Sequence, residues 1–445
     1  MRRGLRAWLL LAACVPLALA VGATWLLTSG GGRDWALARL SAQLPAGTTL
    51  RIDALQGALL GPLEARGVHY VDAHGRVDIA RLHLEHGLLP LLRGHWRVHR
   101  LWLDGVVVRR EPATAAAPPP RWPDLLPRWS LPLTIDVDDL RVRGLSLGRA
   151  GAPTTVLARL DGAGTLGDGA LILHRLRAAA AEGEVTLSGR YVPRARFRSD
   201  LRLEAQWRPS PGGAPVPVHA RLLGDLRAAT LSATAGGAAP LRLQATLRDG
   251  DAAVPTWRLA LESPGLDTAA FGLAATHALA GAVSLEGLGG DARVAARGVV
   301  DGRTFGIAPA TLHLGQESVQ LSALTLRLDE GALTLDGQIG WRRAAPTADL
   351  RLRSDAWRLP ARAGGTDVLA AGALRVHGAV DDWRLEGELR FRRARAQATL
   401  SIAAHGNRER AQLTRADALT PAGRLQASGS VAWAPQPQVD GVVRA

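Results

Sequence analysis

The sequence predicts a mainly β protein, in which an N-terminal transmembrane helix is followed by a long, curved antiparallel β-sheet. Two observations carry this prediction. A largely apolar, uncharged stretch follows the first arginines, and most of the chain alternates apolar with polar residues at period two. Period two with a charged opposite face is typical of half-buried antiparallel strands. Beyond Glu111 we find no clear amphipathic helix, and only residues 176–181 are ambiguous.

The composition excludes several classes of protein. Lys and Arg number 54 against 40 Asp and Glu, and every one of these cations is an arginine. Without lysine the chain cannot build a P-loop, a kinase ion pair or a Schiff base. The single cysteine, Cys14, excludes a disulfide framework and a Cys-rich zinc site. The arginines are spread along alternating faces, which favours contact with anionic headgroups and makes nucleic acid an unexpected partner.

Residues 1–32 are predicted to be a short cytoplasmic tip and a transmembrane signal anchor. Arg2, Arg3 and Arg6 precede an apolar stretch that runs from Ala7 to about Thr28. At 1.5 Å per residue this stretch is long enough for a bilayer of roughly 30 Å. Because the cations precede it, the positive-inside rule places the chain after residue 33 outside the cytoplasm.

Two processed forms remain open. Residues 11–14 resemble a lipoprotein box ending at Cys14, and residues 18–20 would suit cleavage after Ala20. We favour the uncleaved anchor because residues 21–27 continue apolar beyond both cleavage points. Each of the three forms exports the rest of the chain.

The exported chain is predicted to have three parts. Residues 33–112 form a first module, with an amphipathic helix from Trp35 to Leu44 and a second short helix around 88–92. Residues 113–128 contain three consecutive prolines and form a linker. Residues 129–445 form an elongated sheet, within which residues 324–341 are predicted to be a hairpin.

One short unit recurs in the predicted sheet. Residues 183–191, 331–339 and 423–431 share a Gly-x5-Gly pattern, and an aspartate follows the second glycine at an interval of eleven or twelve residues, at Asp200, Asp349 and Asp440. The intervals between units are unequal. This indicates a degenerate repeat of strand pairs and not a propeller of fixed period.

An aliphatic face this long has to be covered, yet the sequence offers almost no helices to cover it. We therefore expect a strongly curved sheet whose concave, apolar face takes acyl chains of membrane lipids. Leu, Val, Ala and Gly make a smooth lining for such chains. No cofactor and no metal are expected. The candidate lining residues are Leu133, Ile135, Val137, Leu201, Leu203, Leu241, Leu243, Leu324, Leu326, Leu328, Leu333, Leu335, Leu350 and Leu352.

Three motifs have the spacing of functional sites and are interpreted as structural. Residues 144–148 match a nucleophile elbow around Ser146, but they alternate as a strand and no helix follows. Residues 162–167 match a dinucleotide fingerprint, yet Asp168 and Gly169 then predict a hairpin turn. His83 and His86 point to opposite faces of a strand, while His95 and His99 share a face but lie far apart. We therefore expect surface histidines and no catalytic residue.

The chain resembles the AsmA-like family and, within it, the TamB branch. The resemblance rests on the anchor and, in order, on residues 50–63, 68–72, 82–86, 91–94 and 101–106, and more loosely on the strand patterns that follow. It implies a β-taco groove, an inner-membrane anchor, and a role in phospholipid transport to the outer membrane and in outer-membrane protein assembly. It also implies an outer-membrane partner of the TamA type, met through a C-terminal domain. Because the sequence ends inside a repeat unit without that domain, we expect either a fragment of a longer protein or a short relative.

The sequence thus predicts a non-enzymatic lipid conduit, single-pass in the inner membrane, with most of its chain in the periplasm of a Gram-negative bacterium. The alternative is an exported β-rich adhesin or glycan-binding protein without lipid transport. An adhesin would expose polar and aromatic loops at its strand ends, whereas this chain has an aliphatic lining.

Overall fold

The structure is a computed structural model that describes most residues from 29 to 444. The segments outside the description are 1–28, 43, 46, 60, 74, 111–121, 125, 130, 132, 150–153, 168, 210–212, 238, 268–277, 316, 330, 342–345, 360–367, 394–395, 433–437 and 445. The chain divides into two compact units. Unit 1 reaches Ala229 and unit 2 starts at Thr230, so that strand β11 (Ala228–Ala235) spans the division.

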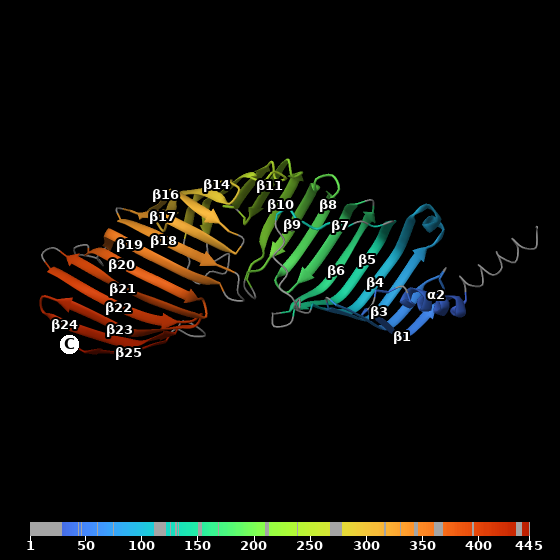
Figure 1. Cartoon of the computed structure of the whole chain (residues 1–445), viewed down its shortest axis with the longest axis horizontal. Coiled ribbons are helices and arrows are strands. Elements are labelled where there is room, and N and C mark those ends of the chain that lie inside the picture. The colour runs from blue at the N-terminus through green and yellow to red at the C-terminus, as the bar shows by residue number, and fades with distance from the viewer. Residues whose placement is uncertain are drawn as a thin grey trace, which may run out of the picture. The chain divides into compact units, whose positions relative to one another are not determined.

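Unit 1 is a curved sheet in which each strand pairs with the next in sequence (Figure 1). Apolar and polar residues alternate along much of these strands, which gives the sheet two different faces. Its strands are β1 Thr49–Gly57, β2 Leu63–Asp72, β3 Gly75–Gly87, β4 His95–Arg110, β5 Thr134–Arg149, β6 Thr155–Gly167, β7 Ala170–Ala180, β8 Gly183–Val192, β9 Arg198–Trp207 and β10 Val216–Gly224.

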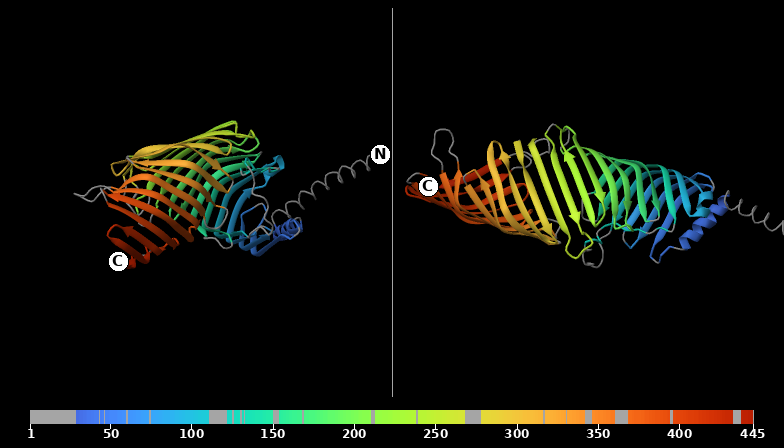
Figure 2. Two further views of the ribbon diagram at one scale, coloured as in Figure 1. Left: turned by 60° about the vertical axis from the view of Figure 1, so that its left-hand side comes forward. Right: turned by 90° about the horizontal axis from the view of Figure 1, so that it is seen from above.

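Unit 2 repeats this plan, and its strands pair antiparallel with their neighbours in sequence (Figure 2). The hairpin predicted for residues 324–341 is confirmed as β17 and β18. The strands are β12 Leu241–Arg248, β13 Thr256–Asp267, β14 Ala278–Leu288, β15 Asp291–Val300, β16 Arg303–Leu314, β17 Ser318–Leu328, β18 Gly331–Gly340, β19 Thr347–Leu359, β20 Val368–Ala379, β21 Asp382–Arg393, β22 Ala396–Gly406, β23 Arg410–Thr420, β24 Gly423–Ala432 and β25 Gln438–Arg444.

The prediction of a purely antiparallel sheet is wrong at one place, because β4 and β5 pair in parallel. His95 lies opposite Thr134 at one end of this pair and Arg110 lies opposite Arg149 at the other. A parallel pair needs a connection long enough to return along the strand, and the segment between Arg110 and Thr134 has that length. The predicted linker 113–128 falls within this crossover, and the sheet of unit 1 continues on both sides of it.

The recurring Gly-x5-Gly unit forms a whole strand in each of its three copies: β8, β18 and β24. The second glycine of each unit lies next to the backbone of the aspartate that follows it by eleven or twelve residues, which is on the neighbouring strand. A Cβ atom on Gly189, Gly337 or Gly429 would overlap the backbone carbonyl oxygen of Asp200, Asp349 or Asp440, respectively. The repeat therefore marks places where two strands approach too closely for any side chain.

Two helical segments precede β4. Helix α2 (Gly30–Ala42) confirms the helix predicted from Trp35, and the 3-10 helix η1 (Leu89–Arg93) lies where a second short helix was predicted. The ambiguous residues 176–181 belong to strand β7 up to Ala180. No helix within the described residues is long and apolar enough to cross a membrane, and residues 7–28 of the predicted anchor lie outside the description.

Few side chains of the described strands are fully buried. One buried cluster holds Ala292, Val294 and Leu312 on β15 and β16, with partly buried apolar side chains around it. In unit 1, Val98 is the most completely buried large side chain, at 2% exposed. A sheet with a second layer packed on it would bury most of its apolar face. These sheets are therefore open, with one apolar face only half shielded from solvent.

Candidate functional site

The candidate site is the apolar face of each sheet. Residues that lie directly opposite one another on neighbouring strands share a face, so the strand register shows how far this face extends. In unit 1 one such cross-strand row runs without a polar residue from β1 to β10: Leu55, Ala65, Leu82, Leu103, Val142, Leu160, Ala178, Val185, Ala205 and Val218.

Unit 2 has a corresponding row that crosses every strand from β12 to β25. It consists only of apolar side chains and glycines: Leu247, Trp257, Gly287, Ala292, Leu312, Leu321, Gly337, Leu350, Val376, Leu385, Ala404, Leu413, Gly429 and Gly441. The row depends on the register of all these strands together. Shifting one strand by a single residue would move its side chains to the other face of the sheet.

The structure places the predicted lining residues on these same faces. In unit 1, Val137 and Leu201 share one cross-strand row, and Leu203 lies in the row beside it. In unit 2, Leu326 lies opposite Leu333, and Leu335 opposite Leu352. All fourteen predicted residues are half-buried, including Leu133, which lies just before β5. Their role in holding a lipid stays a prediction.

Sequence reasoning missed other members of the apolar face. Leu82, Leu103 and Val142 lie in the uninterrupted row of unit 1, although none of them was among the predicted lining residues. The signal was present in the sequence, because Leu82 and Leu84 alternate along β3 as the predicted residues do along their strands.

The opposite face is polar and carries ion pairs. In unit 2 one row on this face consists only of polar residues: Asp291, His313, Gln320, Gln338, Asp349, His377, Arg384, His405, Gln412, Ser430 and Asp440. The Arg375 guanidinium donates two hydrogen bonds of 3.0 Å to the Asp349 carboxylate and lowers its pKa. The two faces therefore have opposite character over many strands.

The residues with enzyme-like spacing lie in ordinary strand positions. Ser146 is in β5, between Val107 of β4 and Val156 of β6, so it does not occupy a strand-to-helix turn. The fingerprint-like glycines 162–167 are in β6, and Gly169 forms the predicted turn before β7 with φ of 68°. Within the described residues no group of three His, Cys, Asp or Glu side chains is placed to hold a metal ion.

The prediction of surface histidines is wrong for His86. It lies on the opposite face from His83, as expected, but that face is the apolar one, because His86 follows Leu82 and Leu84 at period two and pairs with Val98. Burial lowers the pKa of the His86 imidazole, and its ring lies 6.0 Å from that of Trp96 in an edge-on arrangement. His83, by contrast, stacks on Trp102 at 5.2 Å on the polar face.

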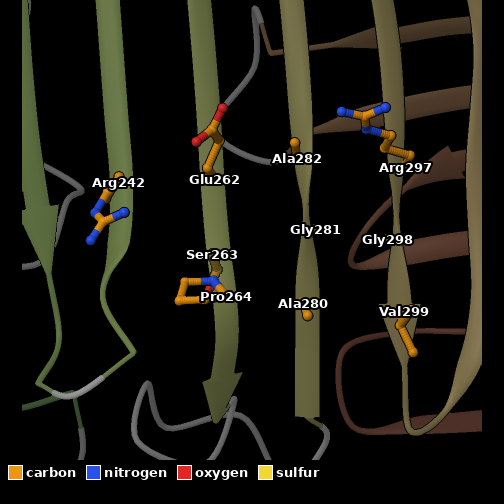
Figure 3. A pocket seen from close by; sticks show the side chains of 10 residues that line it. All are labelled: Arg242, Glu262, Ser263, Pro264, Ala280, Gly281, Ala282, Arg297, Gly298 and Val299. Atoms are coloured by element: carbon orange, nitrogen blue, oxygen red, sulfur yellow. The ribbon is translucent and has the colours of Figure 1, made fainter.

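A shallow hollow of about 610 Å³ lies in unit 2 on β12 to β15 (Figure 3). Small residues such as Ala280 and Ala282 leave it open between the charged side chains of Arg242, Glu262 and Arg297. Glu262, Ala282 and Arg297 form one cross-strand row on the polar face. None of the predicted lining residues reaches this hollow, so it is separate from the candidate site.

A family model described as the N-terminal domain of TamB matches residues 109–347. The match covers more than half of the chain and runs from the end of β4 to the start of β19. The chain belongs to the TamB family. No curated protein and no solved structure matches it. The short segments between residues 50 and 106, on which the resemblance was first based, precede the matched range. TamB-family proteins act in transport and assembly in the bacterial envelope and are not known as enzymes.

Proposed function

We propose that this TamB-family chain is an inner-membrane-anchored lipid conduit of the periplasm, which moves phospholipid toward the outer membrane. The observation that carries the proposal is the pair of uninterrupted apolar rows, from β1 to β10 and from β12 to β25. Each row gives an acyl chain an apolar neighbour at every strand, spaced by about 4.8 Å.

This apolar face is only half-buried, which supports the binding of an apolar ligand that can move along it. Exposed apolar surface costs about 25 cal/mol per Å², and large exposed patches on soluble domains mark binding sites. Most of the lining side chains are small or aliphatic, although Trp257 lies in the row of unit 2. A smooth face of this kind suits acyl chains of differing length better than one specific small molecule.

The predicted anchor completes the proposal. Residues 7–28 would hold the chain in the inner membrane as a single span, and the positive-inside rule would leave both sheet units in the periplasm. The resemblance also implies help in outer-membrane protein assembly. We include that role as a second use of the same face, with a TamA-type outer-membrane protein as its partner.

Mass spectrometry of the lipids that copurify with the full-length chain tests the proposal. We expect diacyl phospholipids to remain bound through washing in a mild detergent, in amounts that scale with the protein. A preparation that is folded by circular dichroism yet carries no lipid, and takes up none from added vesicles of phosphatidylethanolamine and phosphatidylglycerol, would contradict it.

A further inference from the structure

Three exposed arginines gather at one edge of unit 1. Arg194 and Arg196 lie in the turn between β8 and β9, and Arg128 lies in the segment that leads into β5. All three are exposed, and the Arg128 side chain is 57% exposed. The start of β5 and the end of β8 lie at the same edge, because Ile135 and Tyr191 share one cross-strand row. A ligand in solvent can therefore reach all three guanidinium groups.

Direct contacts bring these arginines together. The Arg128 guanidinium lies 4.9 Å from the centre of the Phe197 ring, and Phe197 follows Arg196 in the chain. The turn itself is tight, because the Phe197 N–H donates a 3.3 Å hydrogen bond to the Pro193 carbonyl oxygen. Arg194 and Arg196 therefore lie within a single turn of the backbone, and Arg128 packs on the residue that closes it.

The turn that carries Arg194 and Arg196 has a strained backbone. The φ angles of Arg196 and Phe197 are 53° and 61°, in the left-handed region that residues with a side chain rarely adopt. Three contacts hold this conformation. The Phe197 side chain is buried, the Ser199 hydroxyl donates a 2.8 Å hydrogen bond to the Phe197 carbonyl oxygen, and the Leu226 N–H donates one of 3.0 Å to the Arg196 carbonyl oxygen. Strain of this kind clusters at functional sites, so we looked for a ligand of this turn.

The arginines border the apolar face of unit 1. The Tyr191 ring lies 6.4 Å from that of Phe197 and 5.5 Å from that of Trp129, so aromatic rings lie beside the arginines. Two residues further along each strand, the next cross-strand row holds only aliphatic residues and glycines: Val98, Val137, Gly164, Leu173, Gly189, Leu201 and Leu222. Aliphatic, aromatic and cationic groups thus follow one another toward this edge, in the order found from the core to the surface of a bilayer.

The carboxylates near these arginines leave them able to bind an anion. Asp124 lies 3.4 Å from Arg128, and both side chains are exposed, so this pair contributes little. Asp225, in the following turn at this edge, accepts hydrogen bonds of 2.8 and 3.2 Å from the backbone N–H groups of Arg227 and Ala228. A guanidinium fork fits phosphate through two parallel hydrogen bonds, and a phosphodiester has two free oxygens to accept them.

We propose that this edge of unit 1 binds the phosphate group of a glycerophospholipid whose acyl chains lie on the apolar face. Arg128, Arg194 and Arg196 donate hydrogen bonds to the phosphate oxygens at the exposed edge. The acyl chains extend from there over the aliphatic row. The adjoining apolar face favours a phosphate that is attached to acyl chains over a free anion. The inference rests on the proposed function and adds the part of the lipid that is recognised and its place.

The test uses the full-length protein in detergent and three probes: phosphatidylglycerol, a diacylglycerol with the same chains but no phosphate, and glycerophosphoglycerol, which is the headgroup without chains. We expect the wild type to bind phosphatidylglycerol about three- to thirtyfold more tightly than diacylglycerol, because charge-assisted hydrogen bonds to phosphate contribute a factor of that order at an exposed site. This preference should shrink in 1 M salt, where charges are screened within about 3 Å. Arg128→Gln, Arg194→Gln and Arg196→Gln should each reduce the preference and leave diacylglycerol binding unchanged.

Arg208→Gln is the matched control, because Arg208 is an exposed arginine just after β9, at the opposite edge of unit 1. It should leave the preference for phosphatidylglycerol unchanged. Circular dichroism and the retained binding of diacylglycerol show that each variant is folded.

Three results would overturn the inference: equal binding of phosphatidylglycerol and diacylglycerol by the wild type, a full preference that survives in the combined variant of all three arginines, or binding of glycerophosphoglycerol as tight as that of phosphatidylglycerol. The last result would show a site for free phosphate esters that does not use the apolar face. Binding of neither probe that carries acyl chains would instead contradict the proposed function itself.

Discussion

Gly337 of β18 lies against the backbone of Asp349 in β19 so closely that a Cβ atom on the glycine would overlap the Asp349 carbonyl oxygen. Its φ of 133° is also one that residues with a side chain rarely adopt. The same relation joins Gly189 to Asp200 in unit 1. Close strand approach at these glycines is thus a shared structural device of the two sheets.

Gly337→Ala should destabilise unit 2 because the new methyl group has no room. The backbone conformation alone should cost about 1–3 kcal/mol, before any displacement of β19. Thermal unfolding followed by circular dichroism measures the change. Gly237→Ala is the control, because a Cβ there meets nothing within 4 Å. Equal melting temperatures for the two variants would contradict the close approach.

Unit 2 should lose stability in acid through Asp417 of β23. The guanidinium groups of Arg424 and Arg415 donate hydrogen bonds to this carboxylate, whose side chain is 8% exposed, and they hold its pKa well below the ordinary 3.8. A carboxyl whose folded pKa is depressed adds stability above its unfolded pKa, and this stability is lost as pH falls below about 4. Denaturant unfolding at pH 7, 4 and 2.5 should show the decline.

Asp417→Asn should lower the stability at pH 7 and flatten the decline below pH 4, because the variant no longer takes up that proton. Glu409→Gln removes an exposed carboxylate of the same unit and should do neither. An unchanged acid profile in Asp417→Asn would show that the ion pairs contribute no net stability.

Ser146→Ala should leave lipid copurification and folding intact, because the serine only occupies a position in β5 between two paired strands. His83→Ala should likewise retain function, with a small loss of stability from its contact with Trp102. Loss of function with unchanged folding in either variant would instead support an enzymatic site.

The topology can be checked with a reporter fused after Arg110. An alkaline phosphatase fusion should be active and a cytoplasmic reporter inactive, and the full-length protein should fractionate with the inner membrane. N-terminal sequencing that starts at Cys14 or Val21 would show that the anchor is cleaved.

Strand alternation made much of the fold predictable. In residues 324–341 the alternation of leucines with polar residues defined two strands and their turn, because both signals are local. The Gly-x5-Gly unit likewise marked three strands, although only the structure explains its second glycine by the neighbouring Asp carbonyl.

The parallel pairing of β4 with β5 was not predictable, because it depends on the path of a long connection and not on either strand's own pattern. His86 was missed for a different reason. Its spacing from Leu82 and Leu84 already placed it on the apolar face. In the sequence, however, His86 was interpreted only by its spacing from the other histidines, as a possible metal ligand. The full width of the apolar face also required the register of every strand, which no single strand encodes.

The central claim, that acyl chains lie on the apolar face, is tested most directly by lipid copurification with Leu326→Asp. Leu326 lies half-buried between Ile307 and Leu333, so an aspartate there places a charge in the path of the chains. Arg327→Glu, on the exposed polar face, is the control and should keep both lipid and fold. We predict that Leu326→Asp stays folded by circular dichroism but loses most of its lipid. A Leu326→Asp protein that retains wild-type lipid, or that unfolds while the wild type carries none, would contradict the account.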